Sequence, residues 1–241
     1  MQEDEKESAE DLFVRGEYER AVIAWDEEGE KEPLRSQEWR KKGIALRKLG
    51  RYNESVEALD MAIALDEKDA DAWRNRGMAQ NQLGRYAEAA ASCEKAIALD
   101  PSNVRTWIVR GFAQHNLGKY ERAVEAYARA IELCPLGADG RRAWNNRGAA
   151  LDNLHRHEEA VESYEEAIMI DPFDIYAWNN KGVAQGVLGR HEEAVRCFKK
   201  AIEIEPAYAT AWKNLGVALK ALNLEAESQA ALQRARDLGL D

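Results

Sequence analysis

Hydrophobic and polar positions recur along the chain with the 3.6-residue spacing of helices that bury one face. Residues 178–206 contain two such patterns, the first over about 176–188 and the second over about 192–204. Gly189 separates them, because glycine can enter the left-handed conformation past a helix end without a steric penalty. Pro206 ends the second pattern, because proline cannot continue a helix. The stretch therefore predicts a helix hairpin with a tight turn.

The same hairpin pattern recurs along the chain with a period of 34 residues, lengthened once to 37. Six tryptophans mark it, at Trp39, Trp73, Trp107, Trp144, Trp178 and Trp212. A glycine follows each tryptophan after four residues, an alanine after six and a leucine after ten. Self-similarity at such a period indicates helical repeats that bury their apolar faces by stacking. We therefore expect an all-α fold of about seven antiparallel hairpins.

The predicted repeats form a single domain. They occupy residues 2–35, 36–69, 70–103, 104–140, 141–174, 175–208 and 209–241. The first is degenerate, with Glu5 where later repeats have tryptophan, and its acidic surface suits a solubilising cap. Three extra residues in the fourth repeat predict a longer loop between repeats over residues 136–140. The last repeat lacks the final proline and is expected to act as the C-terminal cap.

Composition and charge narrow the expected setting and partners. The chain of 241 residues has no apolar run near the roughly 18 residues of a membrane helix. Its acidic start lacks the basic-then-apolar order of a signal peptide, so we expect a cytoplasmic protein without membrane contact. Of the net charge of -10, residues 1–32 contribute -9 through 13 acidic and 4 basic residues. Nucleic-acid binding by a basic surface is therefore disfavoured.

Reactive side chains form no recognisable catalytic group. The sequence has no glycine-rich phosphate loop, no CxxC pair and no His/Cys/Asp grouping at reactive spacing. Cys93, Cys134 and Cys197 fall within or at the end of second helices and are expected to be buried thiols. His157 and His191 occupy equivalent turn positions, but a metal site would also need carboxylate ligands in a defined geometry. We expect no catalytic residues, no metal and no cofactor.

The repeat resembles the tetratricopeptide repeat, and the resemblance covers essentially the whole chain. In the Trp178 repeat the family pattern is carried by Trp178, Gly182, Ala194, Phe198, Ala201 and Pro206. Two positions differ from the family pattern. Where the family has leucine before the glycine, five repeats have Lys or Arg, and where it has a first-helix tyrosine, the repeats have Leu or Gln. The resemblance implies a right-handed superhelical α-solenoid whose first helices line a concave groove. It also implies a non-catalytic scaffold for protein–protein interaction.

The resemblance places ligand contacts at positions 2, 5, 6, 9, 12 and 13 of each repeat, with the tryptophan counted as position 4. Position 6 is asparagine in four repeats, at Asn75, Asn146, Asn180 and Asn214. A carboxamide can pair with both the N–H and the C=O of an extended peptide backbone. A similar asparagine ladder lines the superhelix of O-linked N-acetylglucosamine transferases. The alternative is that these asparagines only cap or solvate a helix surface.

The same positions carry more cations than acids, against the sign of the net charge. The candidate peptide-binding cations are Arg40, Arg74, Arg105, Arg142 and Lys213, with Lys41, Arg47, Lys48 and Lys220 beside them. Only Asp71 and Asp152 oppose them. A concave surface of one sign attracts the opposite charge, so we expect an acidic peptide or a C-terminal carboxylate as the partner.

Two further interpretations stay open. Chaperone-binding members of the family clamp a terminal carboxylate with residues that correspond here to Arg40, Ile44, Asn75, Arg105 and Val109. Two of these five are apolar, which departs from the clamp pattern. The other interpretation is a structural or self-associating repeat protein that assembles through exposed solenoid ends.

Overall fold

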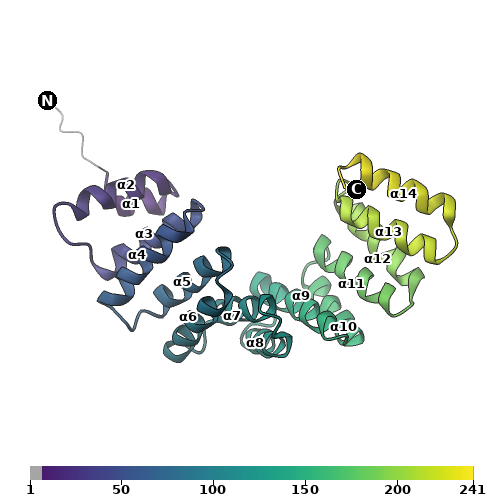
Figure 1. The fold of residues 1–241 in the computed structure, drawn as a ribbon, viewed down its shortest axis with the longest axis horizontal. Helices are drawn as coiled ribbons and strands as arrows, with labels where there is room; N and C mark the ends of the chain where they lie inside the picture. Colours follow the sequence, from purple (N-terminus) through teal and green to yellow (C-terminus); the bar gives the residue numbers. More distant parts are fainter. Residues whose placement is uncertain (1–6, 241) are drawn as a thin grey trace. The chain divides into compact units, whose positions relative to one another are not determined.

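The chain folds into helices joined by short turns. The computed structural model describes residues 7–240, and these form fourteen α-helices and no strand (Figure 1). The predicted all-α repeat fold is therefore confirmed, whereas Glu5 lies outside the described residues. The chain divides into two compact units at Leu117 and Gly118, in the turn between the two helices of the fourth repeat. No helix among residues 7–240 has the length and apolar character needed to cross a membrane.

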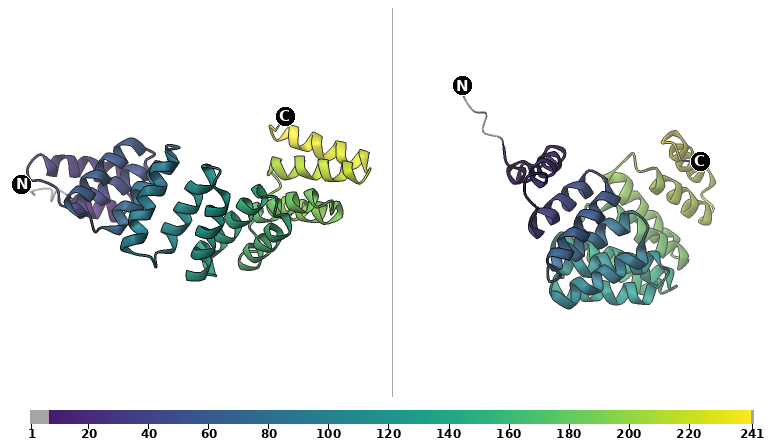
Figure 2. Two further views of the ribbon diagram at one scale, coloured as in Figure 1. Left: turned by 60° about the horizontal axis from the view of Figure 1, so that its bottom comes forward. Right: turned by 60° about the vertical axis from the view of Figure 1, so that its left-hand side comes forward.

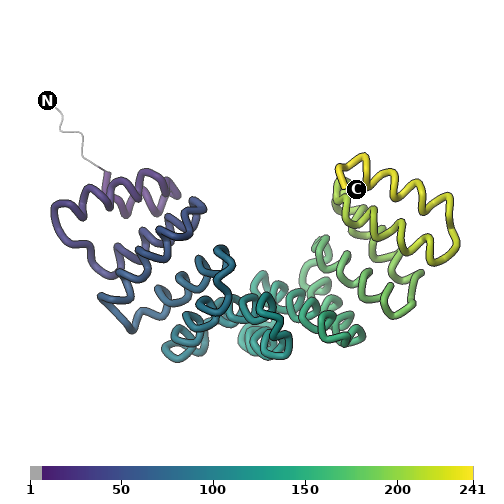
Figure 3. The backbone as a smooth tube through the Cα atoms, in the orientation of Figure 1, coloured from purple at the N-terminus to yellow at the C-terminus, as the bar shows by residue number. Residues whose placement is uncertain are grey.

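The N-terminal unit contains three complete hairpins and the first helix of the fourth repeat. Its helices are α1 (Ala9–Val14), α2 (Tyr18–Gly29), α3 (Ser36–Lys48), α4 (Tyr52–Leu65), α5 (Ala70–Gln82), α6 (Tyr86–Leu99) and α7 (Val104–Asn116). The two helices of each hairpin pack together, and each second helix also packs on the first helix of the next repeat (Figure 3).

The C-terminal unit begins with the second helix of the fourth repeat and continues with three complete hairpins. Its helices are α8 (Tyr120–Leu133), α9 (Gly137–Asn153), α10 (His157–Ile170), α11 (Ile175–Val187), α12 (His191–Ile204), α13 (Ala209–Ala221) and α14 (Glu225–Asp237). Successive helices lie side by side in the views of Figures 1 and 2 and are in contact. The predicted bounds of α11 and α12 are correct to within one residue at each end.

The turn inside each hairpin uses a residue with positive φ. Gly189 has φ +74°, and the next amide, that of Arg190, donates to the Gln185 carbonyl at 2.9 Å. The predicted role of this glycine is confirmed. In two later repeats His155 and Asn223 take the same conformation, with φ of 57° and 59°. Asparagine and histidine are among the non-glycine residues that tolerate this region best.

Small residues on the first helices allow the large residues of the second helices to approach closely. A Cβ atom added to Gly182 would lie 2.6 Å from a ring carbon of Phe198, and one at Gly148 would lie 2.5 Å from the Tyr164 ring. Both rings are buried. Close packing of this kind leaves no room for even one methyl group.

The repeated tryptophans fasten each first helix to the loop before it. The indole N–H of Trp178 donates to the Pro172 carbonyl at 2.9 Å, and that of Trp212 donates to the Pro206 carbonyl at 2.9 Å. Trp73 and Trp107 make the same bond six residues back. The predicted structural role of these tryptophans thus includes a hydrogen bond as well as packing.

The basic residues that replace the family leucine stack on these tryptophans. In five repeats the Lys or Arg three residues after the tryptophan lies over the indole, with its charged group 4.8–5.7 Å from the ring centroid. Several also reach an acid on the preceding second helix, as in the Arg76–Asp60 pair at 3.2 Å and the Lys181–Glu165 pair at 2.8 Å. The departure from the family pattern is therefore a cation–π and ion-pair contact between repeats.

The longer fourth repeat does not lengthen a loop, and that prediction is wrong. Instead α9 begins at Gly137 and has 17 residues, where the first helices of the neighbouring repeats have 13. The extra residues add about one turn at its N-terminal end. Gly140 makes this possible, because a Cβ there would lie 2.7 Å from the backbone of Cys134 and Pro135.

Two of the three cysteines are buried as predicted, and one is not. Cys93 and Cys197 are buried, and burial raises the pKa of the Cys93 thiol to about 12. Cys134 is partly exposed at the end of α8, where its thiol donates to the Leu136 carbonyl at 3.1 Å. The early start of α9 leaves only three residues after α8, so no loop covers this thiol.

Candidate functional site

The residues predicted to bind a ligand lie on the first helices of the repeats. In the N-terminal unit α3 contacts α5 and α5 contacts α7; in the C-terminal unit α9 contacts α11 and α11 contacts α13. Each row of first helices thus forms a continuous surface. We call them the N-terminal first-helix face (α3, α5, α7) and the C-terminal first-helix face (α9, α11, α13).

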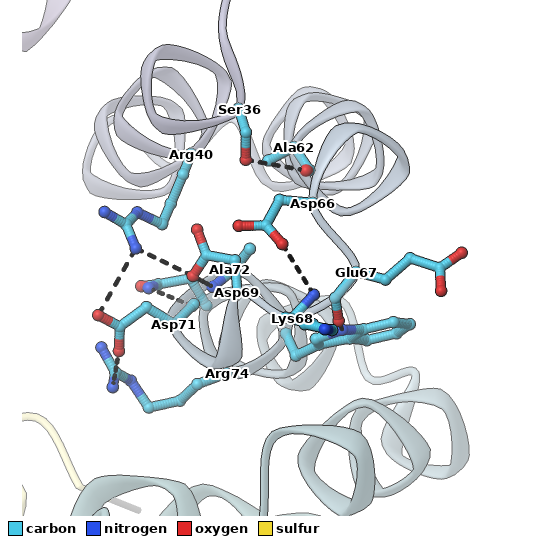
Figure 4. A network of polar contacts seen from close by, with 12 residues as sticks. Ser36, Arg40, Ala62, Asp66, Glu67, Lys68, Asp69, Asp71, Ala72 and Arg74 are labelled. Carbon is cyan, nitrogen blue, oxygen red and sulfur yellow. Dashed lines mark hydrogen bonds and ion pairs between the residues drawn. The ribbon is translucent and has the colours of Figure 1, made fainter. Parts of the chain in front are cut away.

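Acidic residues near the start of α5 neutralise two predicted cations of the N-terminal first-helix face. Arg40 on α3 donates to Asp69 at 2.9 Å and lies 3.7 Å from Asp71, and Arg74 on α5 pairs with the other oxygen of Asp71 (Figure 4). Asp69 also caps α5 by accepting from the Ala72 amide at 3.0 Å. The sequence count of charges covered only the six ligand-contact positions of each repeat. It therefore left out Asp69, which precedes α5. The face is therefore less basic than the sequence count indicates.

Arg47 is a partly buried cation of this face that keeps an uncompensated charge. It lies on α3, is partly buried, and makes no ion pair or hydrogen bond with the residues that the structure describes. Burial and, to a smaller extent, the neighbouring charge of Arg74 lower the pKa of the Arg47 guanidinium. The buried Nε atoms of Arg47 and Arg74 both lack a hydrogen-bond partner. By contrast, Lys41 pairs with Glu10.

The asparagines of the N-terminal first-helix face serve the fold. Asn75 is buried, and its amide donates to the Asp71 carbonyl one turn earlier at 2.7 Å. Asn81 links two first helices, because its amide on α5 donates to the Val109 carbonyl on α7 at 3.1 Å. Little of the Asn75 carboxamide is left for a ligand.

On the C-terminal first-helix face four asparagines form a directed chain of hydrogen bonds. Asn214 donates to Asn179 at 2.9 Å, Asn179 donates to Asn180 at 3.5 Å, and Asn180 donates to Asn145 at 3.3 Å. The chain runs from α13 through α11 to α9, so each position-6 asparagine pairs with position 5 of the preceding repeat. Asn214, Asn179 and Asn180 each donate one of their two N–H groups here, and Asn145 only accepts.

Sequence reasoning missed Asn145, and it expected Asn179 to face a partner, whereas Asn179 is buried and accepts from Asn214. The doubled asparagine after Trp144 and Trp178 was the available signal, since the pair recurs after 34 residues. Asn146, in contrast, makes no hydrogen bond with any residue described in the structure. It is the predicted ladder residue whose carboxamide is wholly available.

The remaining predicted cations lie at exposed positions. Arg142 is exposed near the start of α9, and its charge acts weakly on buried Tyr127, whose pKa is raised overall by burial. Arg105 and Lys213 are also exposed, and each already has a contact within the chain. The structure does not bring these three cations together with Arg40 and Arg74 into one cluster of described contacts.

A largely apolar cleft lies between α11 and α13 on the C-terminal first-helix face. Its volume is about 300 Å³, and Val183, Val187 and Val217 line it with exposed side chains. Gly186 keeps its floor open, and Asn214 and His191 are the polar side chains at its wall. This face therefore offers apolar contact and amides, whereas the N-terminal first-helix face offers a cation.

Comparison with protein families agrees with this architecture. Family sequence profiles described as tetratricopeptide repeat match residues 40–104, 104–135, 142–174 and 175–208, about two thirds of the chain. The chain belongs to the tetratricopeptide repeat family. Tetratricopeptide repeats are in general non-catalytic protein-interaction modules, so this chain is a protein-interaction scaffold.

Solved structures support the same tetratricopeptide fold. A structure titled MamA MSR-1 C2 is 30% identical, with a TM-score of 0.60 over 71% of this chain and 97% of its own. YrrB, described as a TPR protein with an unusual peptide-binding site, is 22% identical, with a TM-score of 0.61 over 76% and 93%. Cut9 of the Cut9–Hcn1 complex is 15% identical, with a TM-score of 0.72 over 96% of this chain but 45% of its own. No curated protein matches this tetratricopeptide chain by sequence.

Proposed function

We propose that the first-helix faces of this scaffold bind extended polypeptide segments, and that the N-terminal first-helix face selects an acidic group. The observation that carries the proposal is the partly buried Arg47, which has no acidic partner in the described chain and lies near Arg74. A cation withdrawn from water without a partner is costly, and a ligand carboxylate relieves that cost. Arginine also binds a carboxylate through two parallel N–H groups.

The side chain or C-terminal carboxylate of an acidic residue meets this requirement equally well. Arg40 and Arg74 are already shared with Asp69 and Asp71, so they contribute orientation more than net charge. We therefore expect substitution of Arg47 to weaken binding of an acidic ligand more than substitution of Arg40 does. The proposed ligand stays acidic, and we expect its charged group to pair with the partly buried Arg47.

The asparagine chain supports recognition of the ligand backbone on the C-terminal first-helix face. Asn146 is wholly available, and Asn180 and Asn214 each retain one amide N–H. These groups can pair with the carbonyls of an extended segment whatever its side chains are. YrrB, which has the same fold and is described as having a peptide-binding site, supports the proposal that such a fold binds peptides.

The acidic selection is tested by Arg47→Gln, which removes the charge and leaves a shorter polar side chain with two N–H donors. The probe is a fluorescein-labelled nonapeptide with two aspartates, compared with the same peptide carrying asparagines. Fluorescence anisotropy is expected to show about tenfold weaker binding of the aspartate peptide to the variant, since a charged hydrogen bond is lost. Raised salt weakens wild-type binding in the same direction. Equal binding of both peptides to the wild-type protein contradicts the proposal.

The backbone recognition is tested separately by combining Asn146→Ala with Asn180→Ala. A panel of peptides that bind the wild-type chain is expected to bind more weakly, while far-ultraviolet circular dichroism stays unchanged. Unchanged affinity across the panel removes the asparagines from the proposed site. Sedimentation at several concentrations checks the self-associating alternative, which requires a mass that rises with concentration.

A further inference from the structure

A cleft opens on the opposite side of the N-terminal unit, between the second helices α2 and α4. Its volume is about 540 Å³, and its walls include Trp25, Trp39, Met61 and Leu65. An adjoining cleft of about 310 Å³ continues along α4 and shares Trp39 and Met61 with the first. Figures 1 and 2 show α2, α3 and α4 packed in succession, and Trp39 of α3 lines both clefts. Volumes of this size are typical of ligand pockets, which hold roughly 300–1,000 Å³.

The first repeat has a glycine at the cleft where the next five repeats have isoleucine. Gly29 aligns with Ile63, Ile97, Ile131, Ile168 and Ile202. Ile63 and Trp73 belong to one apolar cluster, and Ile202 and Trp212 belong to another. Gly29 has no side chain to add to the equivalent cluster, against which Trp39 packs. A Cβ at Gly29 would meet only ordinary contacts, 3.5 Å or more from Leu34, so the fold itself does not require glycine here.

Two large apolar side chains at the cleft are exposed to water. Met61 is 47% exposed and Leu65 is 57% exposed. The position of Met61 is charged in every later repeat, at Lys95, Arg129, Glu166, Lys200 and Arg234. The second repeat therefore exposes an apolar side chain to solvent at a position where later repeats carry a charged one. Exposed apolar surface of this kind is typical of an interaction site.

The rim of the cleft carries unbalanced negative charge. Its two cations are already paired, Lys42 with Asp26 and Arg51 with Glu54. Glu30 on the main cleft and Glu57 on the adjoining one make no ion pair with any described residue. The surrounding segment 7–32 has ten acidic and three basic residues. Charge complementarity therefore requires a basic partner.

We propose that this cleft is a second docking surface, which binds a polypeptide segment presenting a large apolar side chain flanked by lysine or arginine. The apolar side chain enters above Trp39 and contacts Met61 and Leu65. The flanking cations lie against Glu30 and Glu57. The partner is opposite in charge to the ligand proposed for the N-terminal first-helix face, so the two sites are independent of one another.

The test uses the full chain and a fluorescein-labelled nonapeptide with one leucine between two pairs of lysines. Gly29→Ile fills the cleft with the residue that later repeats carry. Fluorescence anisotropy is expected to show a loss of about tenfold or more in affinity, because burial of a leucine side chain is prevented. The melting temperature of this variant is expected to stay equal or to rise.

Met61→Lys is the matched second variant, because the third and sixth repeats carry lysine at that position. It is expected to weaken binding of the same peptide to a similar extent. If Gly29→Ile does not fold, Met61→Lys decides the question. Met169→Ser on α10, where the side chain is 68% exposed and lies outside both proposed sites, is the control expected to bind the leucine–lysine peptide as the wild type does. The proposal is overturned if the wild-type chain does not bind this peptide, or if a folded Gly29→Ile or Met61→Lys variant binds it unchanged. It is likewise overturned if peptides with alanine for leucine or glutamate for lysine bind equally well.

Discussion

Gly182 and Gly186, one helical turn apart on α11, show how the environment of a residue decides its role. A Cβ at Gly182 would lie 2.6 Å from the Phe198 ring, whereas at Gly186 the nearest atom is the Ala194 Cβ at 3.9 Å. We predict that Gly182→Ala destabilises the fold by about 1–3 kcal/mol, because the buried ring cannot move away freely. Urea denaturation followed by circular dichroism measures the loss.

Gly186→Ala is the matched control on the same helix. Alanine is favoured over glycine inside a helix by about 0.8–1.0 kcal/mol, and space is available for the methyl group. This variant is therefore expected to equal or exceed the wild type in stability. A similar loss of stability in both variants would show that helix α11 tolerates no added atom, against the packing described here.

At the residue scale, sequence reasoning succeeded where a role repeats with the period. Trp178, Gly182 and Gly189 were assigned correctly, because each recurs in a fixed place and has one physical function. It failed for Arg40, whose partner Asp69 lies in the loop before α5. It also failed for Asn75, whose partner Asp71 lies one turn earlier on the same helix. The sequence also could not show that Arg47 lacks an acidic partner, because this depends on the distances between side chains in the folded chain.

At the scale of elements, aspartates at the start of first helices join neighbouring repeats. Asp174 caps α11 by accepting from the Tyr176 and Ala177 amides at 3.0 Å each, and it also binds Arg141 of α9. Its side chain is buried, so both partners depend on it. Asp69 combines the same two contacts at the start of α5, with Arg40. One carboxylate therefore both caps a first helix and links it to the first helix of the preceding repeat.

We predict that Asp174→Ala destabilises the protein by more than the roughly 1 kcal/mol of an ordinary N-cap, because Arg141 is also left without its buried partner. Asn103→Ala provides the comparison, since Asn103 caps α7 through a single bond at 3.3 Å. Chemical denaturation of both variants gives the difference. Equal losses would mean that the Arg141 contact contributes nothing to stability.

The lengthened α9 shows where element prediction fails. Three added residues next to two glycines resemble a loop in sequence, and Gly137 does begin the helix with φ +73°. The helix forms because Gly140 allows its first turn to approach the end of α8 closely. Only the distance between two helix ends, which sequence periodicity does not contain, distinguishes the two outcomes.

At the scale of the whole chain, contacts are local in sequence. Within each unit, helices contact their immediate neighbours and, on the first-helix faces, the next first helix. Stability in such arrays is approximately a sum of repeat and nearest-neighbour contributions. The terminal hairpins have one neighbour each, so α13 and α14 are expected to open more readily than the interior helices.

The last prediction follows from that locality. Leu219 on α13 is buried against Phe198 and Leu215, and Leu219→Ala is expected to cost about 2–5 kcal/mol in local packing. Hydrogen exchange of α13 and α14 should therefore accelerate by more than tenfold, while that of α3 to α6 stays unchanged. Val217→Ala on the same helix, where the side chain is exposed, is the control expected to leave both rates unaltered. Equal acceleration in every helix would instead show that the chain unfolds as one cooperative unit, and local summation of repeat stabilities would be wrong.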